Sequence, residues 1–174
     1  MTAKRAPERK NRKEYSYMKT SKTPSETYTE QVHLVNQSDL NGNRRLFGGT
    51  LLSWIDMTAG IVARRHAERS ITTVAVDNLQ FIAPAYSGDL VVLCAKATYS
   101  GNTSLEVRVD SYVERTDGSR TLINTAYVVL VALDGNEKPC RLPRLVPETD
   151  AEISEFAAGE KRRQLRKERK TDRY

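Results

Sequence analysis

The sequence predicts an α+β protein in which an antiparallel β-sheet wraps around one long central helix. Residues 49–67 are apolar on most of the helical surface, which is typical of a helix buried on several sides. One strand-like segment, 27–36, precedes this helix, and four follow it: 71–83, 90–99, 103–115 and 120–134. A helix that is apolar nearly all round must be covered by the sheet or shared with a second copy of the chain.

The two ends of the chain differ from its middle in composition. Residues 1–26 are rich in Lys, Arg, Glu, Ser, Thr and Pro and hold few aliphatic side chains, so we expect a basic disordered tail. Residues 27–148 form the predicted folded domain. Residues 149–174 are a charged C-terminal tail, predicted to be partly helical, with Phe156 as its one large apolar anchor.

Local signals define the elements between these tails. The helix starts at a Gly-Gly pair and ends in a charged turn, 64–69, whose cations complement the carbonyl end of the helix dipole. β-Branched residues and partial alternation mark the strand at 71–83. Short turns at 100–102 (Ser-Gly-Asn) and 117–119 (Asp-Gly-Ser) predict hairpins between the later strands. A Pro-rich segment, 139–147, then leaves the sheet.

The positive charge of the chain is confined to its ends. The formal net charge is +6, but residues 1–22 carry +6 and residues 160–174 carry +5, so residues 23–159 are mildly acidic. A nucleic-acid-binding domain should carry its basic patch on the fold itself, so nucleic acid is an unlikely partner. The basic tails still allow contact with RNA, an anionic surface or a polyphosphate ligand.

Several other classes of protein are excluded by what the sequence lacks. It has no run of about 18 apolar residues, so no membrane helix is expected. The basic N-terminus lacks the apolar centre of a secretory signal. Cys94 and Cys140 fit no metal-ligand spacing and are expected to be reduced thiols of a cytoplasmic protein. His33 and His66 form no paired-ligand pattern, so no metal site is expected.

Asp56 stands out because it is an acid within the apolar helix. A buried carboxylate is costly unless it is paired, hydrogen-bonded or used in chemistry. Two turns upstream, Gly48 and Gly49 open the helix, where unpaired N–H groups can bind an anion. Together these features suggest acyl chemistry. A second interpretation is a solvated polar stripe, because Ser53, Asp56, Gly60 and Arg64 fall at helical spacing.

Residues 39–56 (DLNGNRRLFGGTLLSWID) carry a family resemblance. The segment resembles the hotdog-fold acyl-CoA thioesterases, in particular the YciA-type and brain-type acyl-CoA hydrolases. Their pattern is an Asn, a short loop, Phe or His before Gly-Gly, and an Asp or Glu seven residues after the second Gly. Supporting blocks occur in the same order at 74–81, 84–89, 101–104 and 131–139. One departure is Arg44, where the family usually has Gly; it would reshape the loop or place a cation near the thioester or the CoA moiety.

The resemblance implies a hotdog fold, in which the sheet wraps around the helix at 49–67. It also implies a homodimer, with three dimers commonly assembled into a hexamer. The active site would then lie at the dimer interface, with Asn41 and Asp56 contributed by opposite subunits.

The same resemblance assigns three catalytic candidates. Asp56 would act as general base for water, or as the nucleophile that forms a mixed anhydride, and the residues leave both open. Asn41 would orient the water or the thioester carbonyl, with Asn43 as the alternative if the loop register differs; both also suit an ordinary turn. The N–H of Gly49 would bind the oxyanion, and Gly48 would let the acyl group approach, although two glycines also simply permit a tight turn.

Most of the substrate-binding candidates carry polar or cationic side chains, and the other two lie at the Gly-Gly pair. They are Phe47, Gly48, Asn78, Thr103, Ser104, Arg64 and Arg141. The hydroxyls at 103 and 104 suit CoA phosphates or pantetheine, or an ordinary hairpin. The arginines suit phosphate, as would Arg65, Lys138 and Arg144, although each alone also fits a solvated surface. Asn78 follows Asp77. We expect it at the dimer seam or beside the active site, or in a purely structural role with its polar groups hydrogen-bonded within the fold. From its hydrophobicity alone, Phe47 is expected to lie in the hydrophobic core.

We therefore expect an acyl-CoA thioester hydrolase that releases free CoA and a carboxylic acid. It needs no cofactor, since CoA enters as part of the substrate, and no membrane. The alternative is a non-catalytic acyl-CoA-binding or regulatory hotdog protein, which Arg44 would favour. Hotdog dehydratases use a His/Asp or His/Glu pair, and neither His33 nor His66 lies in a matching motif.

Overall fold

The computed structural model describes residues 19–171. The helical elements are α1 (Pro24–Thr27), the 3-10 helix η2 (Gln37–Asp39), α2 (Gly48–Ala67) and α3 (Asp150–Thr171). The strands are β1 (Ser21–Lys22), β2 (Thr29–Leu34), β3 (Ser70–Phe81), β4 (Leu90–Ser100), β5 (Ser104–Glu114), β6 (Arg120–Leu133) and β7 (Arg144–Leu145).

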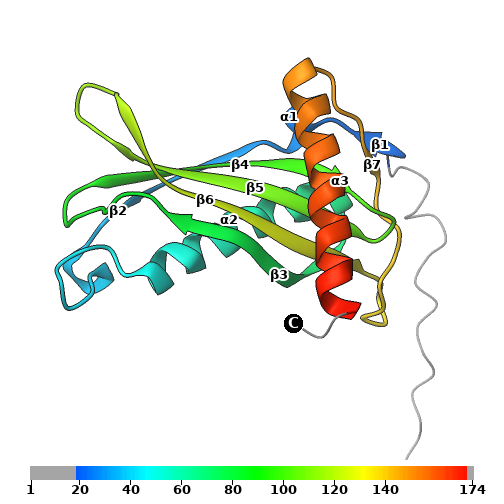
Figure 1. Cartoon of the computed structure of the whole chain (residues 1–174), viewed down its shortest axis with the longest axis horizontal. Helices are drawn as coiled ribbons and strands as arrows, with labels where there is room; N and C mark the ends of the chain where they lie inside the picture. Colours follow the sequence, from blue (N-terminus) through cyan, green and yellow to red (C-terminus); the bar gives the residue numbers. More distant parts are fainter. Residues whose placement is uncertain (1–18, 172–174) are drawn as a thin grey trace, which may run out of the picture.

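Five of these strands form one antiparallel sheet in the order β2-β4-β5-β6-β3. The long helix α2 lies against one face of the sheet, and α3 crosses the opposite face (Figure 1). The hairpins predicted at the two short turns join β4 to β5 and β5 to β6. The predicted hotdog architecture, a sheet packed around one long helix, is confirmed, and β2 and β3 are the two edges of the sheet.

The core lies between α2 and the inner face of the sheet. Strand alternation places Val91, Leu93 and Ala95 of β4 on that face, and all three are fully buried. On α2, Ile55 and Val62 lie two turns apart and are equally buried. This packing holds α2 rigidly, so the side chains on its opposite face are presented in fixed positions.

One face of α2 departs from the expectation of a helix buried nearly all round. Ser53, Asp56 and Arg64 are exposed, and Met57 keeps 50% of its surface accessible. The sheet covers only the side of the helix that faces it. The uncovered side is the one that carries the candidate catalytic acid.

The prediction of a disordered tail over residues 1–26 is wrong for its last part, while residues 1–18 lie outside the described residues. β1 pairs in parallel with β7, and α1 follows it. Lys22 is the physical reason, because its side chain is 7% exposed and its ammonium donates to the carbonyl of Arg65 at 2.5 Å. It also pairs with Glu68 at 2.6 Å.

The C-terminal segment is more regular than the predicted partly helical tail. α3 runs for 22 residues, and Phe156 packs on Tyr99 of β4 with ring centroids 4.9 Å apart. Residues 172–174 of the predicted tail lie outside the described residues. Within residues 19–171, no helix is long and apolar enough to cross a membrane.

Candidate active site

Asp56 lies on the uncovered face of α2. Its carboxylate accepts a hydrogen bond from the hydroxyl of Thr73 on β3, at 2.7 Å from Oδ1. The predicted burial of Asp56 is therefore wrong for the single chain, since the residue is exposed. The single chain matches the polar-stripe interpretation, in which this face of the helix meets solvent unless another molecule covers it.

Apolar side chains surround this face of α2. Val74 and Val76 of the edge strand β3 are 55% and 40% exposed, and Phe47, at the start of α2, is 54% exposed. Phe47 is therefore not core, contrary to the expectation from its hydrophobicity. An edge strand with exposed apolar residues is a template for pairing with another chain. The surroundings of Asp56 thus have the character of an interface.

The loop before α2 holds Asn41 in a tight turn. The side-chain oxygen Oδ1 of Asn41 accepts from the backbone N–H of Asn43 at 2.9 Å and of Arg45 at 3.2 Å. The backbone of Asn41 also donates to the carbonyl of Arg45 at 2.8 Å. The turn thus uses the carbonyl end of the amide, and among residues 19–171 nothing occupies its Nδ2 donor. Asn41 serves the turn and still has N–H groups to offer a substrate.

Asn41 lines a cavity of about 390 Å³ at the start of α2. Gly48, Leu51, Phe81 and Ile123 also line it, so its wall is mostly apolar. Asn43, the alternative to Asn41, is exposed and does not line this cavity. The cavity can take an acyl group beside an amide donor.

The Gly-Gly pair forms the first residues of α2. Phe47 caps the helix without a side-chain hydrogen bond, so the first-turn N–H groups have no partner from the cap. A Cβ on Gly49 would lie 2.5 Å from the ring of Phe47, and one on Gly48 would lie 3.1 Å from the ring of Phe81. Glycine is therefore needed at Gly49 beside the ring of Phe47, and Gly48 leaves room for the ring of Phe81. The first-turn N–H groups suit an oxyanion.

Arg44 adopts the backbone conformation that glycine would adopt. Its φ is 56°, in the left-handed region. Its N–H donates to the carbonyl of Asn41 at 2.9 Å, which closes the turn. The turn thus forms with an arginine at a position that favours glycine, at the cost of backbone strain.

The structure does not bring the substrate-binding candidates together within one chain. Arg64 lines a cavity of about 600 Å³ beside the uncovered face of α2, together with Gln31 and Met57. Thr103 and Ser104 accept backbone hydrogen bonds from Ala132 and Gly101 in the β4–β5 hairpin, as an ordinary turn would.

Asn78 lies at an irregularity of the edge strand β3. Its φ is 50°, and the register of β3 against β6 shifts between Asp77 and Gln80. Asn78 is exposed, whereas Asp77 is 7% exposed and paired with arginines of α3. Asp77 is thus structurally satisfied, and Asn78 faces outward on the strand that borders Asp56.

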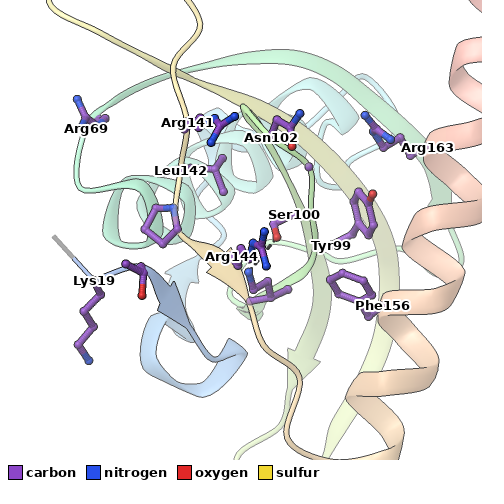
Figure 2. A pocket seen from close by; sticks show the side chains of 14 residues that line it. Lys19, Arg69, Tyr99, Ser100, Asn102, Arg141, Leu142, Arg144, Phe156 and Arg163 are labelled. Carbon is purple, nitrogen blue, oxygen red and sulfur yellow. Dashed lines mark hydrogen bonds between the residues drawn. The ribbon is translucent and has the colours of Figure 1, made fainter.

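Arg141 lines a third and larger cavity, of about 880 Å³, at the other end of α2 (Figure 2). Its cationic residues come from separate segments: Lys19, Arg69, Arg141, Arg144 and Arg163. No Asp or Glu is among the described residues that line it. The aromatic pair of Tyr99 and Phe156 forms part of the wall. This combination suits a polyanionic ligand with an aromatic ring system.

Sequence reasoning missed two parts of this arrangement. Thr73 was not singled out, because its contact with Asp56 arises only when β3 packs beside α2. Phe156 was expected as an anchor, but its place in a cavity wall, with Arg163, depends on how α3 crosses the sheet. Neither residue has a motif around it that identifies this role.

The chain matches the model of the thioesterase superfamily over residues 43–118. The acyl-CoA thioester hydrolase YkhA of Bacillus subtilis, described as uncharacterized, is 38% identical over 154 residues, which are 85% of this chain and 90% of the relative. The chain belongs to the acyl-CoA thioester hydrolases. An acyl-CoA hydrolase from Staphylococcus aureus, solved with butyryl coenzyme A, coenzyme A and coenzyme A disulfide, is 31% identical with a TM-score of 0.83. That match covers 87% of this chain and 93% of the Staphylococcus chain.

Two further findings concern solved members of the family. An apo hexameric acyl-CoA thioesterase is 32% identical, with a TM-score of 0.82 over 86% of this chain and 97% of that one. The Staphylococcus hydrolase was also solved with an asparagine, an aspartate or a threonine replaced by alanine. Those three positions are 15 and 17 residues apart, the same spacings that separate Asn41, Asp56 and Thr73 in this hydrolase.

Proposed function

We propose that this chain hydrolyses acyl-CoA thioesters with Asp56 as the catalytic carboxylate. The observation that carries the proposal is the placement of Asp56, held by Thr73 at 2.7 Å on a helix face bordered by exposed apolar residues. The matching spacing of the residues replaced in the Staphylococcus hydrolase supports it.

The chemistry follows from the groups available. As general base, Asp56 takes a proton from water while the water oxygen attacks the thioester carbonyl. The resulting oxyanion is bound by the N–H of Gly49 and the Nδ2 group of Asn41. The C–S bond then breaks and CoA leaves as a thiolate, which is a good leaving group because thiols have a pKa of about 8.5. As nucleophile, the carboxylate of Asp56 would instead form a mixed anhydride that water hydrolyses.

The active site needs two chains. Within one chain the cavity lined by Asn41 does not include Asp56, which lies two helical turns beyond Gly49. We infer a homodimer in which Asp56 of one protomer faces Asn41 and Gly49 of its partner, with three dimers in a hexamer. The exposed apolar residues of β3 and α2, and the hexameric assembly of a solved relative, support this arrangement.

The basic cavity is the proposed site for the nucleotide end of CoA. Arg141, Arg144 and Arg163 provide forked donors for its phosphates, and the rings of Tyr99 and Phe156 provide apolar contact for the adenine. Arg64 lies beside the uncovered face of α2, where its side chain would contact the polar part of the pantetheine arm. Thr103 and Ser104 do not line the basic cavity, whose wall there is formed by Gly101 and Asn102.

Release of free CoA from a panel of acyl-CoAs, from two to about sixteen carbons, tests the proposal. We expect the wild type to turn over at least one chain length, and Asp56→Asn to lose on the order of 100-fold or more in kcat while keeping CoA affinity. Asp150→Asn, an exposed aspartate at the start of α3, is the matched control and should keep wild-type activity.

An inactive wild type that still binds acyl-CoA would support the alternative of a binding or regulatory protein. Arg44, in place of the family's usual Gly, is the feature that favours that alternative. The observed turn weakens it, because Arg44 takes the left-handed conformation and donates the hydrogen bond that closes the turn around Asn41.

A further inference from the structure

The outer face of the sheet, opposite to α2, holds a fully buried acid. Glu106 of β5 is 1% exposed, and its carboxylate is bound by α3. Arg162 donates from Nη2 to Oε1 at 2.8 Å, and Arg166 donates to Oε2 at 2.7 Å. Thr98 of β4 adds its hydroxyl to Oε1 at 2.9 Å. Removing one member of such a buried pair leaves an uncompensated charge, so the contact fixes α3 strongly.

A second acid extends this contact along α3. Asp77 of β3 is 7% exposed and accepts from Arg166 at 3.2 Å and from Arg169 at 3.1 Å. We name these residues the α3 clamp: Asp77, Glu106, Arg162, Arg166 and Arg169. Because Asp77 and Glu106 lie on strands flanking β6, the clamp sets both the position of α3 and the direction in which it crosses the sheet.

Gly159 brings α3 directly onto β4. A Cβ at this position would lie 2.6 Å from Cβ of Tyr99 and 3.0 Å from Oε1 of Glu106. Only glycine therefore lets α3 come close enough to the sheet for its arginines to reach Glu106 and Asp77. With α3 seated, Phe156 packs on Tyr99, and the guanidinium of Arg163 lies 6.0 Å from the centroid of the Tyr99 ring.

The clamp and the basic cavity meet on α3, where Arg162 of the clamp is next in sequence to Arg163 of the cavity. Phe156 and Arg163 line the cavity (Figure 2). Arg162 pairs with Glu106 and lies over the ring of Tyr127, and it thereby holds the helix on the sheet. An arginine binds phosphate well only when its planar fork is correctly placed. The position of Arg163 therefore depends on the buried carboxylate of Glu106.

We infer that Glu106 is a positioning residue for the CoA nucleotide. Through the α3 clamp it fixes the wall of the basic cavity, and it thereby sets the affinity for CoA while leaving the cleavage of the thioester unaffected. This inference rests on the proposed function, because it assigns the cavity to the nucleotide end of the proposed substrate.

Two variants loosen the clamp from opposite sides. Glu106→Gln removes the charge that holds two arginines, and Gly159→Ala lifts the helix from Tyr99 although alanine favours helix formation. Glu160→Gln, at an exposed position of the same helix, is the matched control. The kcat and KM of each full-length variant are measured with one acyl-CoA and with the corresponding acyl-pantetheine, which lacks the nucleotide. The Kd for CoA is measured by calorimetry.

We expect both clamp variants to raise KM for acyl-CoA and Kd for CoA by about tenfold, the loss of one charge-assisted contact, with kcat within twofold. Their kcat/KM for acyl-pantetheine should equal that of the wild type. Unchanged KM and Kd would overturn the inference, and so would equal losses on both substrates, which indicate general disruption. If Glu106→Gln does not fold, Gly159→Ala decides. A wild type inactive on both substrates contradicts the proposed function alone, since the Kd for CoA still decides this inference.

Discussion

Arg44 shows at the scale of one residue how the loop before the helix is maintained. A non-glycine residue at a φ of 56° is strained, typically by about 1 kcal/mol or more. The turn is nevertheless closed by the hydrogen bond from Arg44 to Asn41. The turn that holds Asn41 is therefore formed at some cost in stability.

Arg44→Gly is expected to stabilise the protein. Glycine adopts the left-handed conformation without strain, and its larger unfolded-state entropy offsets only part of the gain, so we predict about 0.5–1 kcal/mol of added free energy of unfolding. Denaturant unfolding measures this change. Arg45→Gly is the matched control, because Arg45 is not among the positive-φ residues, and it should destabilise by about 0.5 kcal/mol. Equal effects of the two substitutions would contradict the strain argument.

The residues proposed to carry the chemistry were predictable from the sequence in unequal measure. Asn41, Gly49 and Asp56 were identified because they lie in one continuous motif of 18 residues. Thr73 could not be, since its hydrogen bond to Asp56 joins a strand to a helix 17 residues away in the chain. The exposure of Asp56 was also unpredictable, because periodicity shows that a helix face is apolar but not which neighbour covers it.

His66 connects two elements at the end of α2. It is fully buried, and its Nε2 lies 2.9 Å from the carbonyl of Pro143, in the segment that leads into β7. A carbonyl only accepts, so Nε2 carries the proton. Burial lowers the pKa of His66, and the hydrogen bond to Pro143 opposes this effect in part. Nearby Lys22 lowers the pKa further, against smaller opposing effects of Glu26 and Glu68. The histidine is therefore neutral in the folded protein at neutral pH.

This depressed pKa predicts a loss of stability in mild acid. The unfolded chain binds a proton on His66 near pH 6.5, whereas the folded chain binds it only at lower pH, so the free energy of unfolding falls as the pH drops below 6.5. Chemical denaturation at a series of pH values from 7.5 to 5 measures the slope. His66→Gln should flatten it. His33→Gln is the comparison, because burial also lowers the pKa of His33. A slope identical in wild type and His66→Gln would contradict the assignment.

At the scale of elements, the residue pattern predicted the central sheet and helix well and the two ends of the chain less well. The strands at 70–133 follow from alternation and turn residues that act locally. β1 and α1 do not, because they depend on the buried Lys22 and on pairing with β7, far along the chain. The regular packing of α3 likewise depends on Glu106 and Asp77, acids that the sequence alone gives no reason to connect with arginines 56 to 92 residues away.

The whole molecule has the features of half an active site. Asn41 lies in the loop before α2 and Gly49 in its first turn, and Asp56 lies two turns beyond Gly49 on a face that the chain leaves open. Exposed Val74 and Val76 beside it give that face a surface suited to a second copy. The central claim is that catalysis requires Asp56 from one protomer and Asn41 from the other.

Subunit complementation between Asn41→Ala and Asp56→Ala tests this claim most directly. Each variant alone should be inactive. If the residues come from opposite protomers, a mixed dimer holds one site with both substitutions and one site with neither. Joint unfolding and refolding of equal amounts should then restore about a quarter of wild-type CoA release, since half of the randomly formed dimers are mixed and each has one intact site. If the mixture stays inactive although mixed dimers are shown to form, each site draws both residues from the same protomer, and the claim is contradicted.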